Sequence, residues 1–168
     1  MNFKGRDIIS IRDFSKAELL HILDIAKKLE DKTDNNLLKG KIMASLFFEP
    51  STRTRLSFYL AIKQLGGGTI TLRSNELHLG EGGESLEDTA KILSTYGDGF
   101  MLRTDSDQKL DDFKKYLLIP IINGLSPSSH PTQVLSDVFT VEEIKKKPIS
   151  KLNITWIGDS NNVLNSLI

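Results

Sequence analysis

Two kinds of apolar segment alternate along this 168-residue chain, and the alternation limits its fold more than any other feature. Short apolar runs typical of buried strands fall at residues 42–48, 69–72, 100–102, 119–122 and 152–157. Segments with helical apolar spacing fall at residues 16–30, 52–65, 85–96, 108–116 and 131–143. Strands that alternate with helices form parallel sheets, because each crossover lays a helix on a face of the sheet. We therefore predict an α/β fold with a doubly wound parallel sheet and flanking helices.

Local signals support several of the helix ends. Ser15 and Glu18 have the spacing of a capping box at the start of the first helix. Pro131 suits the first turn of the last long helix. Glycines at 66–68 suit the end of a helix and a turn. These residues predict boundaries independently of the apolar spacing.

A basic segment with a proline, residues 145–148, is the expected domain boundary. We expect one domain over residues 1–147, and the first strand and turn of a second α/β domain over residues 148–168. One strand followed by a short apolar helix cannot bury a core of its own. The chain is therefore expected to be the opening part of a longer protein.

Charge and composition exclude several classes of partner. With 22 basic and 22 acidic residues, the chain has no net field for nucleic acid or an anionic membrane. No apolar run approaches the roughly 20 residues that span a bilayer, and residues 1–7 do not resemble a secretory signal. The absence of cysteine excludes disulfides and thiolate metal sites. We expect a cytoplasmic protein with no metal site and no nucleic-acid or membrane partner.

Polar residues follow the first buried strand, at the place where open parallel sheets bind their ligands. Residues 51–55 read Ser-Thr-Arg-Thr-Arg and open a helix. The free N–H groups of a helix start, with hydroxyls and a guanidinium group around them, suit a phosphate. An ordinary capped helix with two surface arginines would show the same residues, so the pattern alone leaves both interpretations open.

Two further strand ends strengthen the phosphate interpretation. Arg103 directly follows one strand, and a loop after the next strand leads to His130 and Gln133. Taken alone, such an arginine is usually a surface charge, and a histidine before a proline is usually a helix cap. Because the carboxyl ends of parallel strands share one edge, we expect these side chains to meet Arg53 in a cationic pocket. The residues thus predict a small phosphorylated ligand and no particular reaction.

Residues 47–58, Phe-Phe-Glu-Pro-Ser-Thr-Arg-Thr-Arg-Leu-Ser-Phe, closely resemble the signature of the aspartate and ornithine carbamoyltransferases. The resemblance continues through residues 83–90, 101–104, 130–133 and 156–163, so it extends along essentially the whole chain. It implies a carbamoyl-phosphate-binding domain, the start of an amino-acid-binding domain, a homotrimer and no cofactor. The implied reaction is an acyl-type transfer, in which an uncharged amine attacks the carbamoyl carbon and phosphate leaves.

The resemblance also implies roles for single residues. The carbamoyl-phosphate-binding set is Ser51, Thr52, Arg53, Thr54, Arg103, His130, Gln133 and, from a neighbouring subunit, His78. Within this set the implied catalytic residues, which stabilise the charge that develops on the carbamoyl oxygen, are Arg103, His130 and Thr54. Asn162 is implied to contact the amino-acid acceptor. Without the resemblance, His78 would be an exposed loop histidine and Asn162 a turn asparagine that caps the next helix.

Smaller features bear on the acceptor. Thr132 and residues 9–13 are typical of the aspartate members of the family. In contrast, the loop at 79–83 lacks the lysine of those members, and segments 122–126 and 158–163 are similar to the ornithine members. We therefore expect L-ornithine as acceptor and citrulline as product, in arginine metabolism. Carbamoylation of aspartate in pyrimidine synthesis is the alternative.

The later motifs that build the acceptor site in this family have no counterpart before Ile168. We therefore expect that the chain does not turn over substrate alone. A truncated, non-catalytic module that binds carbamoyl phosphate is a further alternative.

Overall fold

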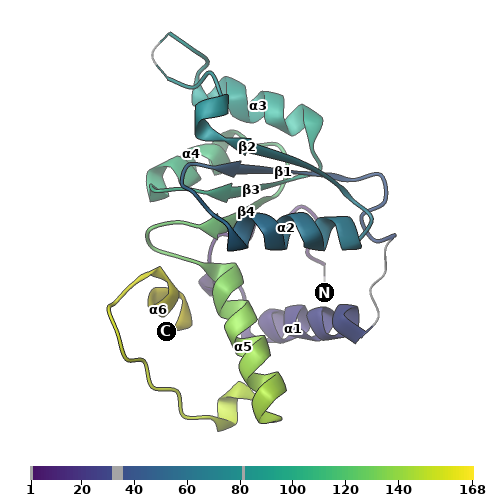
Figure 1. Cartoon of the computed structure of the whole chain (residues 1–168), viewed down its shortest axis with the longest axis vertical. Helices are drawn as coiled ribbons and strands as arrows, with labels where there is room; N and C mark the ends of the chain where they lie inside the picture. The colour runs from purple at the N-terminus through teal and green to yellow at the C-terminus, as the bar shows by residue number, and fades with distance from the viewer. Residues whose placement is uncertain (1, 32–35, 81) are drawn as a thin grey trace.

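The computed structural model describes residues 2–31, 36–80 and 82–168 (Figure 1). The α-helices are α1 (Lys16–Asp31), α2 (Arg53–Gln64), α3 (Leu86–Tyr96), α4 (Asp107–Tyr116), α5 (Pro131–Lys145) and α6 (Asn162–Leu167). The strands are β1 (Ile42–Phe47), β2 (Gly68–Arg73), β3 (Gly99–Arg103) and β4 (Ile121–Leu125). Short 3-10 turns lie at Ile11–Asp13, Ser74–Glu76 and Ile149–Lys151.

The four strands form one parallel sheet in the order β2-β1-β3-β4. The chain passes from β1 to β2 on one side, then crosses back to β3 on the other side of β1. Right-handed crossovers in opposite directions place α2 on one face of the sheet and α3 and α4 on the other (Figure 1). The predicted parallel sheet, wound in both directions and flanked by helices, is confirmed.

The main core lies between the sheet and the helices α3 and α4, which cover one of its faces. Alternate residues of β1 and β3 point into it, because successive side chains of a strand face opposite sides. Its buried members are Ala44, Leu46, Ala90, Leu93, Phe100, Leu102, Leu110, Phe113 and Ile121. The opposite face of the same strands is buried too, which explains why their apolar runs are continuous.

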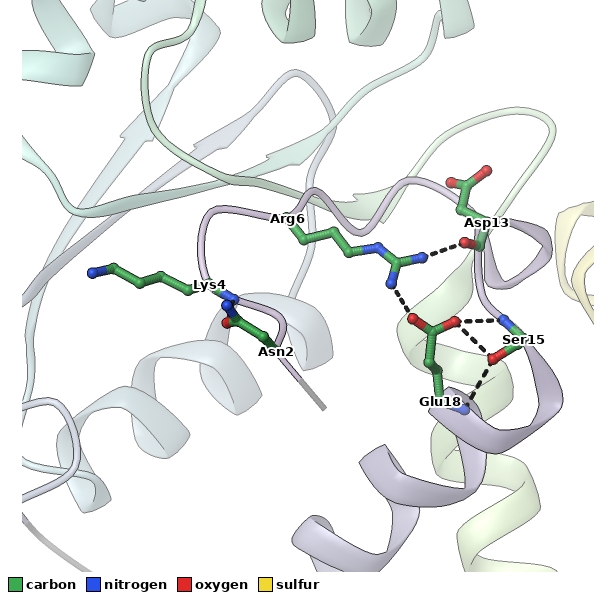
Figure 2. A network of polar contacts seen from close by, with 6 residues as sticks. All are labelled: Asn2, Lys4, Arg6, Asp13, Ser15 and Glu18. Carbon is green, nitrogen blue, oxygen red and sulfur yellow. Dashed lines mark hydrogen bonds and ion pairs between the residues drawn. The ribbon is translucent and has the colours of Figure 1, made fainter.

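A polar network ties the N-terminal segment to the start of α1 (Figure 2). The Glu18 carboxylate accepts hydrogen bonds of 2.8 Å from both the backbone N–H and the hydroxyl of Ser15, and Glu18 N donates to Ser15 Oγ at 3.3 Å. The predicted capping box is therefore present. Arg6 forms an ion pair with the same carboxylate and also donates to the carbonyl oxygen of Asp13. The bonds from Ser15, followed by those from Arg6, lower the pKa of Glu18 from 4.5 to about 2.

Two expectations about strands are wrong. The last strand of the sheet begins at Ile121 and not at 119, and it continues to Leu125. Residues 152–157 form no strand: most of them are exposed, and no strand of the described chain lies beside them. Backbone N–H and C=O groups form a strand only where a neighbouring strand supplies their partners. Within the described residues, no helix combines the length and apolar character needed to cross a membrane.

The Glu18 network predicts how the fold responds to acid. Because the pKa of Glu18 is lowered, its contribution to stability is fully present above pH 4.5 and is lost as the pH falls towards 2. We expect Glu18→Gln to lower the melting temperature at neutral pH. The melting temperature of this variant should also fall less than that of the wild type between pH 4.5 and pH 2. Thermal unfolding followed by circular dichroism measures both. Glu143→Gln, at an exposed position on α5, is the control, and a wild-type pH profile for Glu18→Gln would contradict the prediction.

Candidate active site

The candidate site is an open cavity of about 1000 Å³ at the carboxyl edge of the sheet. The β1–α2 turn, the ends of β3 and β4, the start of α5 and the segment that enters α6 line it. The direction of chain winding reverses between β1 and β3, so that the connections from their carboxyl ends diverge to opposite faces. Parallel sheets bind ligands at such switch points.

The start of α2 forms one wall of this cavity. Ser51, Thr52, Arg53 and Thr54 all line it. Thr52 is the N-cap residue, but its side chain makes no capping hydrogen bond. The first N–H groups of a helix have no partner within the helix and carry the positive end of its dipole. This wall therefore combines backbone donors, hydroxyls and a guanidinium group, as an anion site requires.

Arg103 connects the end of β3 to this wall. Its Nη1 donates a hydrogen bond of 3.2 Å to Thr54 Oγ1. Its Nε is buried and has no hydrogen-bond partner among the described residues. A register shift between Leu102 and Arg103 interrupts the pairing with β4, and irregularities of this kind re-aim side chains beside active sites. A second cation with an unused donor thus lies at the switch point.

His130 precedes the first residue of α5 and is 8% exposed. Its backbone N–H donates to Ser166 Oγ at 2.9 Å, and Thr132 Oγ1 lies 3.4 Å from its Nδ1. Burial and then the charge of Arg103 lower the pKa of His130 below its ordinary 6.5, while Asp137 acts in the opposite direction. The imidazole is therefore neutral at neutral pH, with one N–H donor and one acceptor nitrogen.

Gln133 and Asn162 line the same cavity from α5 and α6. Gln133 Nε2 donates to Asp137 Oδ1 at 2.8 Å. Asn162 Nδ2 donates to the carbonyl oxygen of Ser126 at 2.9 Å. The cap of α6 is the preceding residue, Asn161, whose Oδ1 accepts from the first N–H groups of the helix at 3.0 and 3.1 Å. Helix capping therefore does not account for Asn162.

His78 lies apart from the other predicted residues. It is exposed in the loop after β2 and does not line the cavity of its own chain. Its carbonyl oxygen accepts a 2.6 Å hydrogen bond from Glu84 N, which closes this loop. Residue 81, in the same loop, lies outside the described residues. A contact of His78 with a neighbouring subunit stays a prediction.

Five cavity residues with polar groups were not predicted as site residues from the sequence: Ser57, Thr132, Ser136, Asp137 and Trp156. Asp137 lies four residues after Gln133 on α5, and this helical spacing is a signal that could have identified it. Trp156 belongs to the segment expected to form a strand, and its indole Nε1 donates to the carbonyl oxygen of Asp159 at 3.2 Å. The described residues contain no group of three or more side chains suited to hold a metal ion.

Residues 6–143 match the family described as aspartate/ornithine carbamoyltransferase, carbamoyl-P binding domain. The chain belongs to this family. It is 40% identical over 172 residues to the ornithine carbamoyltransferase of Anoxybacillus flavithermus, covering 100% of this chain and 54% of that protein. The ornithine carbamoyltransferase of Staphylothermus marinus is 43% identical over 173 residues, covering 99% and 55%.

A solved structure, ornithine carbamoyltransferase from Pyrococcus furiosus, superposes with a TM-score of 0.92 at 38% identity, over 99% of this chain and 54% of that one. The chain thus spans about half the length of the relatives it matches. The similarity to the family inferred from residues 47–58 is confirmed over the whole chain, as is the expected similarity to its ornithine members.

The environment of His130 predicts its titration. We expect its pKa, measured by NMR of the imidazole resonances, to lie below 6.5. Arg103→Gln should raise this pKa, because it removes a nearby positive charge, but the pKa should stay below 6.5 because burial is the larger cause. Arg55→Gln, on α2 but outside the cavity lining, should leave the titration unchanged. A wild-type pKa at or above 6.5 would contradict this account.

Proposed function

We propose that this protein transfers the carbamoyl group of carbamoyl phosphate to the side-chain amine of ornithine, releasing citrulline and phosphate. The observation that carries the proposal is the hydrogen bond from Arg103 to Thr54, which joins a cation to the start of α2 at the switch point of the sheet. Membership of a family whose matching domain is described as binding carbamoyl-P supports the donor. The names of the relatives support the acceptor.

In this proposal the phosphate group lies at the start of α2. The hydroxyls of Ser51 and Thr52, the guanidinium group of Arg53 and the first N–H groups of the helix donate to its oxygens. Arg103 adds a second positive charge. These donors stabilise the negative charge that the leaving phosphate gains, so they act on the transition state as well as on binding.

The carbamoyl oxygen lies among Arg103, His130 and Thr54. Because Thr54 Oγ1 accepts a hydrogen bond from Arg103, its own O–H remains available to donate. The neutral imidazole of His130 supplies one further N–H donor. As the uncharged amine of ornithine attacks the carbamoyl carbon, these donors stabilise the developing oxyanion. Each such donor typically contributes about 3 kcal/mol to transition-state stabilisation.

The remaining parts of the proposal concern the intact enzyme. Residues 1–147 form the carbamoyl-phosphate domain, and residues 148–168 begin the domain that binds ornithine, with Asn162 as a contact to that substrate. His78 reaches the site of a neighbouring subunit in a homotrimer. The enzyme acts in arginine metabolism in the cytoplasm.

Loss of the Arg53 side chain should remove most of the affinity for carbamoyl phosphate. A charge-assisted hydrogen bond contributes about 1.5–3 kcal/mol, so we expect Arg53→Ala to weaken binding by about 10- to 100-fold. Isothermal titration calorimetry measures this change. Lys63→Ala is the control, since it removes a positive charge from the last turn of the same helix. Equal affinities of Arg53→Ala and the wild type would refute the phosphate assignment.

The acceptor is tested with the intact enzyme. Carbamoyl phosphate and ornithine should yield citrulline, whereas formation of carbamoyl-aspartate from aspartate would overturn the proposed acceptor. Asn162→Ala should raise the KM for ornithine at least about threefold, the loss of one hydrogen bond, with little change in the KM for carbamoyl phosphate. Asn153→Ala, at an exposed asparagine outside the cavity lining, should change neither KM.

A further inference from the structure

Asp137 has an unusual place in the candidate site. It is the one acidic side chain among the described residues that line the cavity, which also contains Arg53 and Arg103. Within the described parts of the chain it forms no ion pair with a basic residue. Its carboxylate instead accepts a hydrogen bond of 2.8 Å from Gln133 Nε2. A negative charge in a cavity that also contains two guanidinium groups thus accepts its hydrogen bond from a neutral amide.

This contact determines the orientation of the Gln133 amide. An amide has a donor end, the NH₂ group, and an acceptor end, the carbonyl oxygen. An ionised carboxylate can only accept, so it bonds to the NH₂ end. The acceptor end, Oε1, is then left over, and no described residue donates a hydrogen bond to it. Gln133 therefore presents an unused acceptor at the cavity wall.

We propose that Asp137 is a positioning residue, which holds the Gln133 amide so that Oε1 accepts a hydrogen bond from the carbamoyl amino group. This proposal rests on the proposed function and extends it to ligand discrimination. Carbamoyl phosphate has an NH₂ group with two N–H donors beyond its phosphate, whereas inorganic phosphate has no group in that position. A fixed acceptor recognises the first ligand, and an amide that is free to turn could offer its NH₂ end to the oxygens of either.

The two ligands also allow charge and orientation to be separated. Both are phosphate anions, so a change in the charge at position 137 affects the two affinities in the same direction. The ratio of the affinities therefore reports the orientation of the Gln133 amide. Asp137→Asn keeps the shape of the side chain but can donate as well as accept, so it no longer selects one amide orientation.

The experiment is calorimetric titration of the purified chain with carbamoyl phosphate and, separately, with inorganic phosphate. We expect Asp137→Asn to reduce the preference for carbamoyl phosphate by about three- to tenfold, the usual value of one neutral hydrogen bond. The affinity for inorganic phosphate should not fall. Asp137→Glu, which retains a carboxylate, should keep part of the preference.

The chain contains a matched control pair. On α4, Gln108 Nε2 donates to Asp112 Oδ1 at 3.0 Å with the same four-residue spacing. In both pairs the glutamine is exposed and the aspartate is half-buried, but neither Gln108 nor Asp112 lines the cavity. Asp112→Asn should therefore leave both affinities unchanged. An equal loss of preference in Asp112→Asn would overturn the proposal.

A double-mutant cycle tests whether Asp137 acts through Gln133. Gln133→Ala should lose the preference to the same extent as Asp137→Asn, and the double variant should lose no more. A further loss in the double variant would show that Asp137 acts by another route, and would overturn the proposal. Circular dichroism on every variant establishes that it is folded.

The pKa of His130, measured without substrate, tests whether the Asp137 carboxylate acts on the candidate site. Because the charge of Asp137 raises the pKa of His130, Asp137→Asn should lower that pKa further, and Asp112→Asn should not. If the wild-type chain binds carbamoyl phosphate no more tightly than inorganic phosphate, the proposed function fails. If the wild type has the preference and Asp137→Asn retains all of it, the positioning role fails and the proposed function stands.

Discussion

β1 pairs in parallel with β2 on one side and with β3 on the other, and the arrangement of the site depends on these two pairings. Parallel pairing brings the carboxyl ends of the strands to one edge. The position of β1 between the strands that follow it makes the two crossovers run in opposite directions, so α2 and α3 cover opposite faces. The connections that leave β1 and β3 therefore diverge at the carboxyl ends of these strands, and the start of α2 meets the last residue of β3 there. The hydrogen bond between Arg103 and Thr54 is a direct consequence of this topology.

The charge of the site is local, because acidic and basic residues balance over the whole chain. Within the described chain, neither Arg53 nor Arg103 forms an ion pair with a carboxylate, so both guanidinium groups remain available to an anion. Burial, and then the charge of Arg103, lower the pKa of His130, which avoids a third positive charge in a half-enclosed space. A cavity of this kind attracts a phosphate and still presents neutral donors and acceptors to the group attached to it. That division matches the two halves of carbamoyl phosphate, the proposed donor.

Local patterns predicted the helices and the edge of the sheet that carries the site, because capping residues and apolar spacing act over a few residues. The errors lie where a partner that is distant in the sequence determines whether a strand forms and where it ends. β4 extends past its apolar residues because Ile8 pairs beside it and because buried Asn123 finds partners at Ile9 and Ser126. Residues 152–157 have strand-forming side chains but no neighbouring strand. The four-residue spacing could have paired Asp137 with Gln133, but the orientation of the Gln133 amide, on which the role of Asp137 depends, is visible only in the structure.

A single buried hydroxyl links the two substrate contacts proposed at the start of α5 and on α6. Ser166, 3% exposed, accepts a hydrogen bond from His130 N at 2.9 Å and donates one of 2.7 Å to the carbonyl oxygen of Asn162. Removal of a buried partner leaves the other group unsatisfied, at a cost of about 1–3 kcal/mol. The backbone of the residue assigned to the carbamoyl oxygen is thus coupled to that of the residue assigned to the acceptor. A displacement of α6 would break a hydrogen bond of His130, so the two halves of the proposed reaction share one structural support.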